Sequence, residues 1–189
     1  MSINVPTLLT LLRILLIPLL VVVYYLPIAW AALFASAIFI LAAITDWLDG
    51  YLARRWNQTT PFGAFLDPVA DKLIVAVALG VLIETHASLW MTAPALIIIG
   101  REIVISALRE WMAELGQRAQ VAVSSLGKWK TSLQMIAIGM LLAFEPGHVW
   151  ACLGLLLLYI AAVLTLWSMF IYLKVAWPMM RPSLAMEKN

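Results

Sequence analysis

Four aspartates are concentrated in one short stretch of the chain. Asp46, Asp49, Asp67 and Asp71 all fall within residues 46–71, in or beside apolar segments long enough to cross a bilayer. An ionised carboxylate that faced lipid there would cost about 3 kcal/mol or more. The four carboxylates therefore need a partner that neutralises them.

Helical periodicity predicts how such a partner is shared. At about 100° per residue, the acidic and small residues of the first segment fall within an arc of about 100°. They are Asp46, Asp49, Gly50 and Ala53. Asp67 and Asp71 are four residues apart and stack on one face of the next helix. If the two faces meet, all four carboxylates converge.

The chemistry of these side chains predicts a metal site. A set of oxygen donors without histidine or cysteine favours hard cations such as Mg²⁺, Mn²⁺ or Ca²⁺, and two divalent ions balance four aspartates. The alternative is a group of ion pairs with Arg54, Arg55 and Lys72. These cations are too few to pair every carboxylate.

The spacing of this stretch is D-x2-D-G-x2-A-R-x8-G-x3-D-x3-D, which resembles the signature of the CDP-alcohol phosphatidyltransferase family. Its positions are filled by Asp46, Asp49, Gly50, Ala53, Arg54, Gly63, Asp67 and Asp71. The resemblance implies that the first three aspartates, Asp46, Asp49 and Asp67, bind two divalent cations, Mg²⁺ or Mn²⁺, which hold the pyrophosphate of CDP-diacylglycerol. It also implies that Asp71 is the general base, and that Gly50, Ala53 and Arg54 lie beside the nucleotide.

The physical chemistry of that reaction agrees with these roles. An alcohol that attacks a diphosphate needs neutralised phosphoryl oxygens and a group that accepts its proton. Gly50 costs about 1 kcal/mol relative to alanine inside a helix, which close approach of the nucleotide to the backbone would explain. The alternative for Gly50 is helix packing, as in membrane bundles.

Composition predicts an all-α integral membrane protein. The chain has 189 residues, of which 65% are hydrophobic and 12% charged, and this balance excludes a soluble globular protein. We expect one membrane domain over residues 1–189. Apolar stretches predict a bundle of six transmembrane helices near 8–26, 30–55, 64–85, 92–115, 128–144 and 149–175. Residues 2–13 can instead form an interfacial helix that leads into the first span.

The positions of the basic residues predict the orientation. The expected loops near 26–30, 85–92 and 144–149 contain no Lys or Arg. The positive-inside rule then places both termini and the aspartates on the cytoplasmic side. The resemblance extends along nearly the whole chain to bacterial members of the family, and implies a multi-pass inner-membrane protein that forms a homodimer.

Three further stretches carry candidate binding residues. The segment N-V-P-T-L-L-T-L-L-R resembles the start of family members in which Thr10 and Arg13 would face the nucleotide site, and a capped interfacial helix is the alternative. The segments R-E-I-V-I-S-A-L-R and G-K-W-K contain four basic residues that are candidates for binding a phosphate on the attacking alcohol. They are Arg101, Arg109, Lys128 and Lys130.

The basic segments leave two questions open. An ion pair of Arg101 with Glu102 or Glu84 is the alternative to a binding role. Lys128 and Lys130 would point about 200° apart on a helix, so at most one of them faces a cavity.

The resemblance implies transfer of a phosphatidyl group from CDP-diacylglycerol to sn-glycerol 3-phosphate, with release of CMP. Inositol phosphate, serine or phosphatidylglycerol is the alternative acceptor within the family. A divalent-metal transporter is the alternative from another class, because it can also hold four aspartates in a bundle. A transporter would not need Gly50, Ala53 and Arg54 at these offsets.

Overall fold

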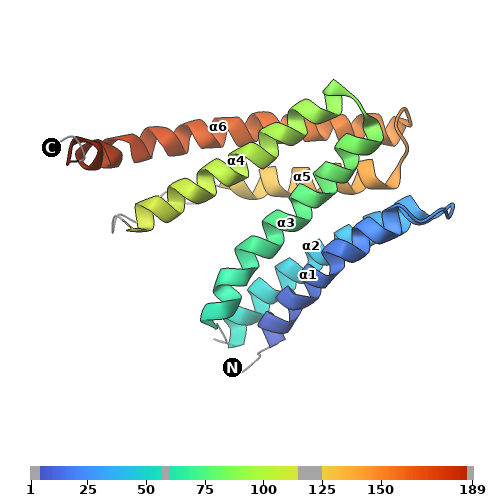
Figure 1. The fold of residues 1–189 in the computed structure, drawn as a ribbon, viewed down its shortest axis with the longest axis horizontal. Coiled ribbons are helices and arrows are strands. Elements are labelled where there is room, and N and C mark those ends of the chain that lie inside the picture. The colour runs from blue at the N-terminus through green and yellow to red at the C-terminus, as the bar shows by residue number, and fades with distance from the viewer. Residues whose placement is uncertain (1–4, 57–59, 115–124, 187–189) are drawn as a thin grey trace.

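The computed structural model describes residues 5–56, 60–114 and 125–186, and these residues form six helices without any strand. Figure 1 shows the helices as long rods that run along the molecule. Their bounds are α1 Val5–Tyr24, α2 Ala31–Trp56, α3 Pro61–His86, α4 Leu89–Glu114, α5 Ser125–Ala143 and α6 Val149–Met186. The predicted all-α class is confirmed, and each of the six predicted segments contains a helix, whereas the crossing of a membrane by all six stays a prediction.

Two helix boundaries differ from the expectation. Residues from Val5 onward belong to α1, which continues through Arg13 and Pro18, so they do not form a separate interfacial helix. A proline is tolerated in such a helix because neighbouring groups compensate for its missing N–H. At the other end, α6 continues to Met186, beyond the expected end near residue 175.

Four of the described helices contain a segment long and apolar enough to cross a membrane, which indicates a membrane protein. These segments are Thr7–Tyr24, Ala31–Leu52, Leu89–Ala113 and Val149–Lys174. Large apolar side chains such as Leu15, Trp47 and Phe170 are exposed on the outside of the molecule, where lipid would cover them. In α5 the apolar part, Lys130–Ala143, is shorter.

The helices pack around an apolar core in which small residues permit close contact. Helix α1 packs against α2 and α3, α5 packs against α2 and α6, and α4 packs against α3 and α6. Gly154 of α6 shows why size matters, since a Cβ there would lie 3.2 Å from the Ala137 carbonyl oxygen of α5. Small residues at such contacts are typical of helix pairs in membranes.

The three connections without Lys or Arg lie at one end of the molecule, on the right in Figure 1. Tyr25, in the connection between α1 and α2, donates a hydrogen bond from its hydroxyl to Glu84 Oε2 at 2.7 Å. This bond, together with partial burial, raises the pKa of Tyr25 to about 12. The tyrosine therefore stays protonated and keeps the connection attached to α3.

Candidate active site

A single arginine joins the two aspartates of α2 to α1. Arg13 is 1% exposed, its Nη1 lies 2.7 Å from Asp46 Oδ1, and its Nη2 donates to Asp49 Oδ2. The Asp49 side chain is 5% exposed and that of Asp46 43%, and a buried carboxylate such as Asp49 is costly without an opposite charge nearby. The chain thus supplies its own counter-cation for Asp46 and Asp49.

The same face of α1 also holds the start of α3. Thr10, one turn before Arg13, donates a hydrogen bond to Asp67 Oδ1. Thr7, one turn earlier, contacts the hydroxyl of Thr60 at 3.0 Å, and Thr60 caps α3 by accepting from the Gly63 amide. Thr7, Thr10 and Arg13 therefore align α2 and α3 from one stripe of α1.

Gly63, a position of the sequence pattern, has a steric explanation in this arrangement. A Cβ at Gly63 would lie 3.0 Å from the Thr60 hydroxyl oxygen and 3.1 Å from that of Thr7. Such a Cβ would displace one or both hydroxyls. The glycine therefore permits the contact that brings α1 to the first turn of α3.

The acidic residues of α2 and α3 lie within electrostatic reach of one another. Asp46 and Asp67 both repel the charge on Asp49, and Asp46 also repels the charge on Asp71. Within the described ranges, however, no three Asp, Glu, His or Cys side chains are close enough to hold a metal ion. Arg13 offsets one of the two negative charges of Asp46 and Asp49, so this pair keeps a net negative charge.

Asp71 faces a polar cavity of about 340 Å³ that the basic residues share. Arg101 and Arg109 of α4 and Lys130 of α5 line this cavity. The whole lining comprises Asp71, Lys72, Val75, Arg101, Glu102, Arg109, Lys130, Thr131, Gln134 and Met135. The structure thus brings a carboxylate from the sequence pattern next to three of the predicted basic residues.

The cavity contains more positive than negative side chains. Four cations and two carboxylates line it, which leaves an excess of two positive charges. Glu102 partly neutralises the cations, because it accepts a hydrogen bond from Arg101 Nη1 and lies 3.9 Å from Lys130 Nζ. The alternative pairing predicted for Arg101 is therefore present, and Arg101 lines the cavity as well.

Three predicted site residues remain without a structural account. The side chains of Ala53, Arg54 and Lys128 lie outside the part of the chain that the structure describes. Lys130 is buried and lines the cavity. Of the two lysines, Lys130 is therefore the one that the structure assigns to a cavity wall.

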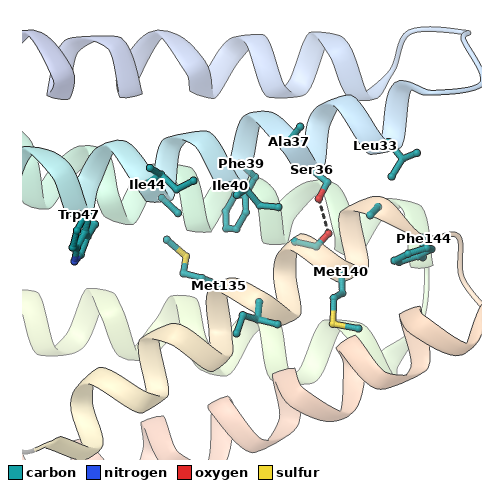
Figure 2. Close-up of a pocket in the computed structure, with 14 residues that line it drawn as sticks. Leu33, Ser36, Ala37, Phe39, Ile40, Ile44, Trp47, Met135, Met140 and Phe144 are labelled. Carbon is teal, nitrogen blue, oxygen red and sulfur yellow. Dashed lines mark hydrogen bonds between the residues drawn. The ribbon is translucent and has the colours of Figure 1, made fainter.

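Sequence reasoning missed an apolar groove of about 690 Å³ between α2 and α5. Figure 2 shows Trp47, next to Asp46 in the sequence, at one end of the groove and Phe144 at the other. Ser36 donates to the Gly139 carbonyl oxygen at 2.8 Å and joins the two helices. The sequence signal was the group of small residues on both helices, which include Ala37, Ala43, Gly139 and Ala143.

Comparisons with known proteins agree with the sequence pattern. A family model described as CDP-alcohol phosphatidyltransferase matches residues 3–167. Three curated relatives carry the name CDP-diacylglycerol--glycerol-3-phosphate 3-phosphatidyltransferase: proteins of Salmonella choleraesuis, Pectobacterium atrosepticum and Shigella flexneri, at 60%, 59% and 58% identity. Each alignment covers 93% of this chain and 96% of the relative.

Removal of the Arg13 charge should destabilise the protein. We expect Arg13→Gln to lower the free energy of unfolding by about 3–5 kcal/mol, because it leaves the Asp46 and Asp49 carboxylates without their counter-charge. Unfolding in detergent micelles with a chelator present measures the change. Arg55→Gln, which alters an exposed arginine near the end of α2, is the control and should change stability by less than about 1 kcal/mol. Equal stability of the two variants would contradict the role given to Arg13.

Proposed function

The chain belongs to the CDP-alcohol phosphatidyltransferase family, and from this premise we propose that it transfers a phosphatidyl group from CDP-diacylglycerol to sn-glycerol 3-phosphate. The products are phosphatidylglycerophosphate and CMP. The names of the relatives at 58–60% identity support this choice of donor and acceptor. The reaction is a step of phospholipid biosynthesis.

One observation carries the proposal: a carboxylate and a group of cations share one cavity. Asp71 is on one wall, and Arg101, Arg109 and Lys130 are on the others. Glycerol 3-phosphate needs both features, because one end of it loses a proton and the other end has a charge close to −2 near neutral pH. The excess of two positive charges in the cavity matches that phosphate.

Asp46, Asp49, Asp67 and Asp71 fit divalent cations in their chemistry, since all four offer carboxylate oxygens. We assign two such cations, Mg²⁺ or Mn²⁺, to this group. When bound, the cations neutralise phosphoryl oxygens and stabilise the leaving phosphate. Arg13 then has to share or release Asp46 and Asp49, with which it pairs in this structure.

The residues of the chain have distinct tasks in the reaction. Asp71 accepts the proton of the acceptor hydroxyl, whose oxygen forms a bond to the phosphorus that bears diacylglycerol. The bond from that phosphorus to the CMP oxygen breaks, and CMP leaves with the electron pair. Arg101, Arg109 and Lys130 hold the acceptor phosphate and orient its hydroxyl towards Asp71. Lys128 is a further candidate for this task.

The nucleotide part of the donor is assigned to the region between α1 and α2. Gly50, Ala53 and Arg54 would flank it on α2, and Thr10 and Arg13 on α1. Arg13 Nε is buried without a hydrogen-bond partner among the described residues, so it can still donate to a phosphate oxygen. The apolar groove that starts at Trp47 is suited to the acyl chains of the same substrate, because its lining is almost entirely apolar.

The proposed setting is a bacterial inner membrane, which the chain crosses six times as a homodimer. Both termini and the active site would face the cytoplasm, because the three connections at the opposite end contain no Lys or Arg.

Cysteines that replace His86 and His148 in a Cys152→Ser background should react with an impermeant reagent from outside. A cysteine in place of Arg55 should react only from inside, and the reverse pattern would overturn this orientation.

The identity of the acceptor is tested with the purified protein. Labelled CDP-diacylglycerol is offered together with glycerol 3-phosphate, inositol phosphate, serine or phosphatidylglycerol, each with Mg²⁺ or Mn²⁺. We expect one labelled lipid, phosphatidylglycerophosphate, and none after a chelator removes the cations. A product with another alcohol would change the assigned acceptor. Metal uptake by reconstituted vesicles without any lipid product would instead support a transporter.

Substitution of Asp71 should affect turnover and donor binding differently from substitution of the other three aspartates. We expect Asp71→Asn to reduce kcat by roughly 100-fold or more while CDP-diacylglycerol still binds, because a base is needed only to remove the proton. Asp46→Ala, Asp49→Ala and Asp67→Ala should abolish both turnover and cation-dependent nucleotide binding. Glu110→Gln, at an exposed carboxylate of α4, is the control. Parallel loss of binding and turnover in Asp71→Asn would make Asp71 chiefly a metal ligand.

Substitution of Arg101 or Arg109 should weaken binding of the acceptor, glycerol 3-phosphate, without weakening binding of the donor, CDP-diacylglycerol. Loss of one charge-assisted contact costs about 1.5–3 kcal/mol, so Arg101→Ala and Arg109→Ala should raise the KM for glycerol 3-phosphate about 10-fold or more. The KM for CDP-diacylglycerol should stay nearly constant. Steady-state kinetics in mixed micelles measure both values, and Lys174→Ala on the exposed side of α6 is the control. An unchanged acceptor KM in both variants would remove these residues from the site.

A further inference from the structure

Helix α6 presents polar side chains to α4 in the middle of an otherwise apolar run. Thr165, Ser168 and Tyr172 follow one another at intervals of three and four residues and therefore share one face of the helix. The described parts of α4 and α6 pack against each other and run side by side in Figure 1. Both arginines of the proposed acceptor site belong to α4.

Ser168 holds Arg101 by accepting a hydrogen bond. The Ser168 hydroxyl donates its own proton to the Thr165 carbonyl oxygen at 2.8 Å. Its lone pairs therefore remain for Arg101 Nη2, which donates to it at 3.2 Å. The other end of the guanidinium donates to Glu102, so the Arg101 side chain, which is 12% exposed, is held at two points.

Glu102 and Ser168, which accept the two hydrogen bonds of Arg101, differ in charge. This difference matters for a site that binds an anion. Glu102 cancels the arginine charge and would compete with an incoming phosphate. Ser168 is neutral, so it fixes the direction of the guanidinium without reducing its attraction for an anion. When a phosphate takes the place of Glu102, Ser168 remains the group that orients Arg101.

Tyr172 supports Arg109 in a different way. Its ring centroid lies 5.6 Å from Arg109 Cζ, within the distance for a cation–π contact. Tyr172 as a whole residue is 8% exposed and packs with Ile105 and Met112 of α4. The Tyr172 ring is thus a fixed surface against which the guanidinium of Arg109 rests, although Arg109 itself is exposed.

We infer that Ser168 and Tyr172 of α6 are positioning residues for the anion-binding arginines Arg101 and Arg109. This inference rests on the proposed function, because it requires that the two arginines bind the acceptor phosphate. Neither α6 residue lines the polar cavity, so each acts through the arginine that it contacts. A flexible arginine side chain loses conformational entropy when it binds a ligand, and a prior contact on α6 reduces that loss.

Paired substitutions separate positioning from packing. Ser168→Ala removes the hydroxyl that accepts the hydrogen bond of Arg101 and should raise the KM for glycerol 3-phosphate about 5-fold. Ser168→Thr retains a hydroxyl and should leave this KM at the value of the unmodified chain. Tyr172→Leu removes the ring and should raise the same KM about 3-fold, whereas Tyr172→Phe retains the ring face and should behave like the unmodified chain. The KM for CDP-diacylglycerol and the thermal unfolding midpoint are measured for every variant, with exposed Leu166→Ala as the control on α6.

A double-mutant cycle decides whether Ser168 acts through Arg101. If it does, Ser168→Ala should add nothing to the acceptor KM of Arg101→Ala. The inhibition constant of inorganic phosphate, as a competitor of glycerol 3-phosphate, should follow the same pattern. If the fold-increases in acceptor KM of the two single variants multiply in the double variant, the inference is overturned and Ser168 is a packing residue. The same holds if Ser168→Ala raises the KM values of both substrates equally.

The failure of this inference differs from a failure of the acceptor assignment. If Arg101→Ala raises the acceptor KM and Ser168→Ala does not, the arginine site stands and the role of α6 is wrong. If neither arginine variant changes that KM, the proposed acceptor site itself is wrong, and the role of α6 falls with it. Each result therefore points to one of the two statements.

Discussion

The pairing of Arg13 with Asp46 and Asp49 is the interaction on which the arrangement of α1, α2 and α3 depends. The two carboxylates and the guanidinium lie within helices that are apolar enough to cross a membrane, where any one charge alone would be costly. Thr10 and Thr7 extend the same stripe of α1 to Asp67 and to the cap of α3. Polar contacts from α1 therefore align α2 and α3, which carry the proposed catalytic residues. Such contacts matter because the hydrophobic effect between helices is weak in lipid.

Both charged regions of the molecule contain an internal counter-charge. Arg13 pairs with both aspartates of α2, and Glu102 pairs with Arg101 and approaches Lys130 in the basic cavity. Each partner has the sign of the ligand that we propose for its region: a cation among the aspartates and a phosphate among the basic residues. When the ligand takes the place of the internal partner, a charge of the same sign replaces it, so the binding groups are not left unpaired before or after binding.

The polar cavity and the apolar groove are lined by different faces of the helices. Asp71 of α3 and the basic residues of α4 and α5 meet in the polar cavity, while α2 and α5 also line the apolar groove. Helix α5 thus has Lys130 towards the cavity and Gly139 towards the groove. A lipid substrate with a charged head and apolar chains needs both environments close together, and a bundle supplies them from different faces of the same helices.

The sequence by itself determined the helices and the family, and tertiary structure decided which charges meet. Apolar runs of about 20 residues and the spacing from Asp46 to Asp71 are local properties, so they can be read without a fold. The partner of Asp49 is 36 residues away, and Ser168 lies 67 residues from Arg101. Such pairs depend on how helices pack against one another, and hydropathy alone does not specify that packing. This is why sequence reasoning placed Arg13 beside a nucleotide and missed its contact with the aspartates, and why it passed over the groove between α2 and α5.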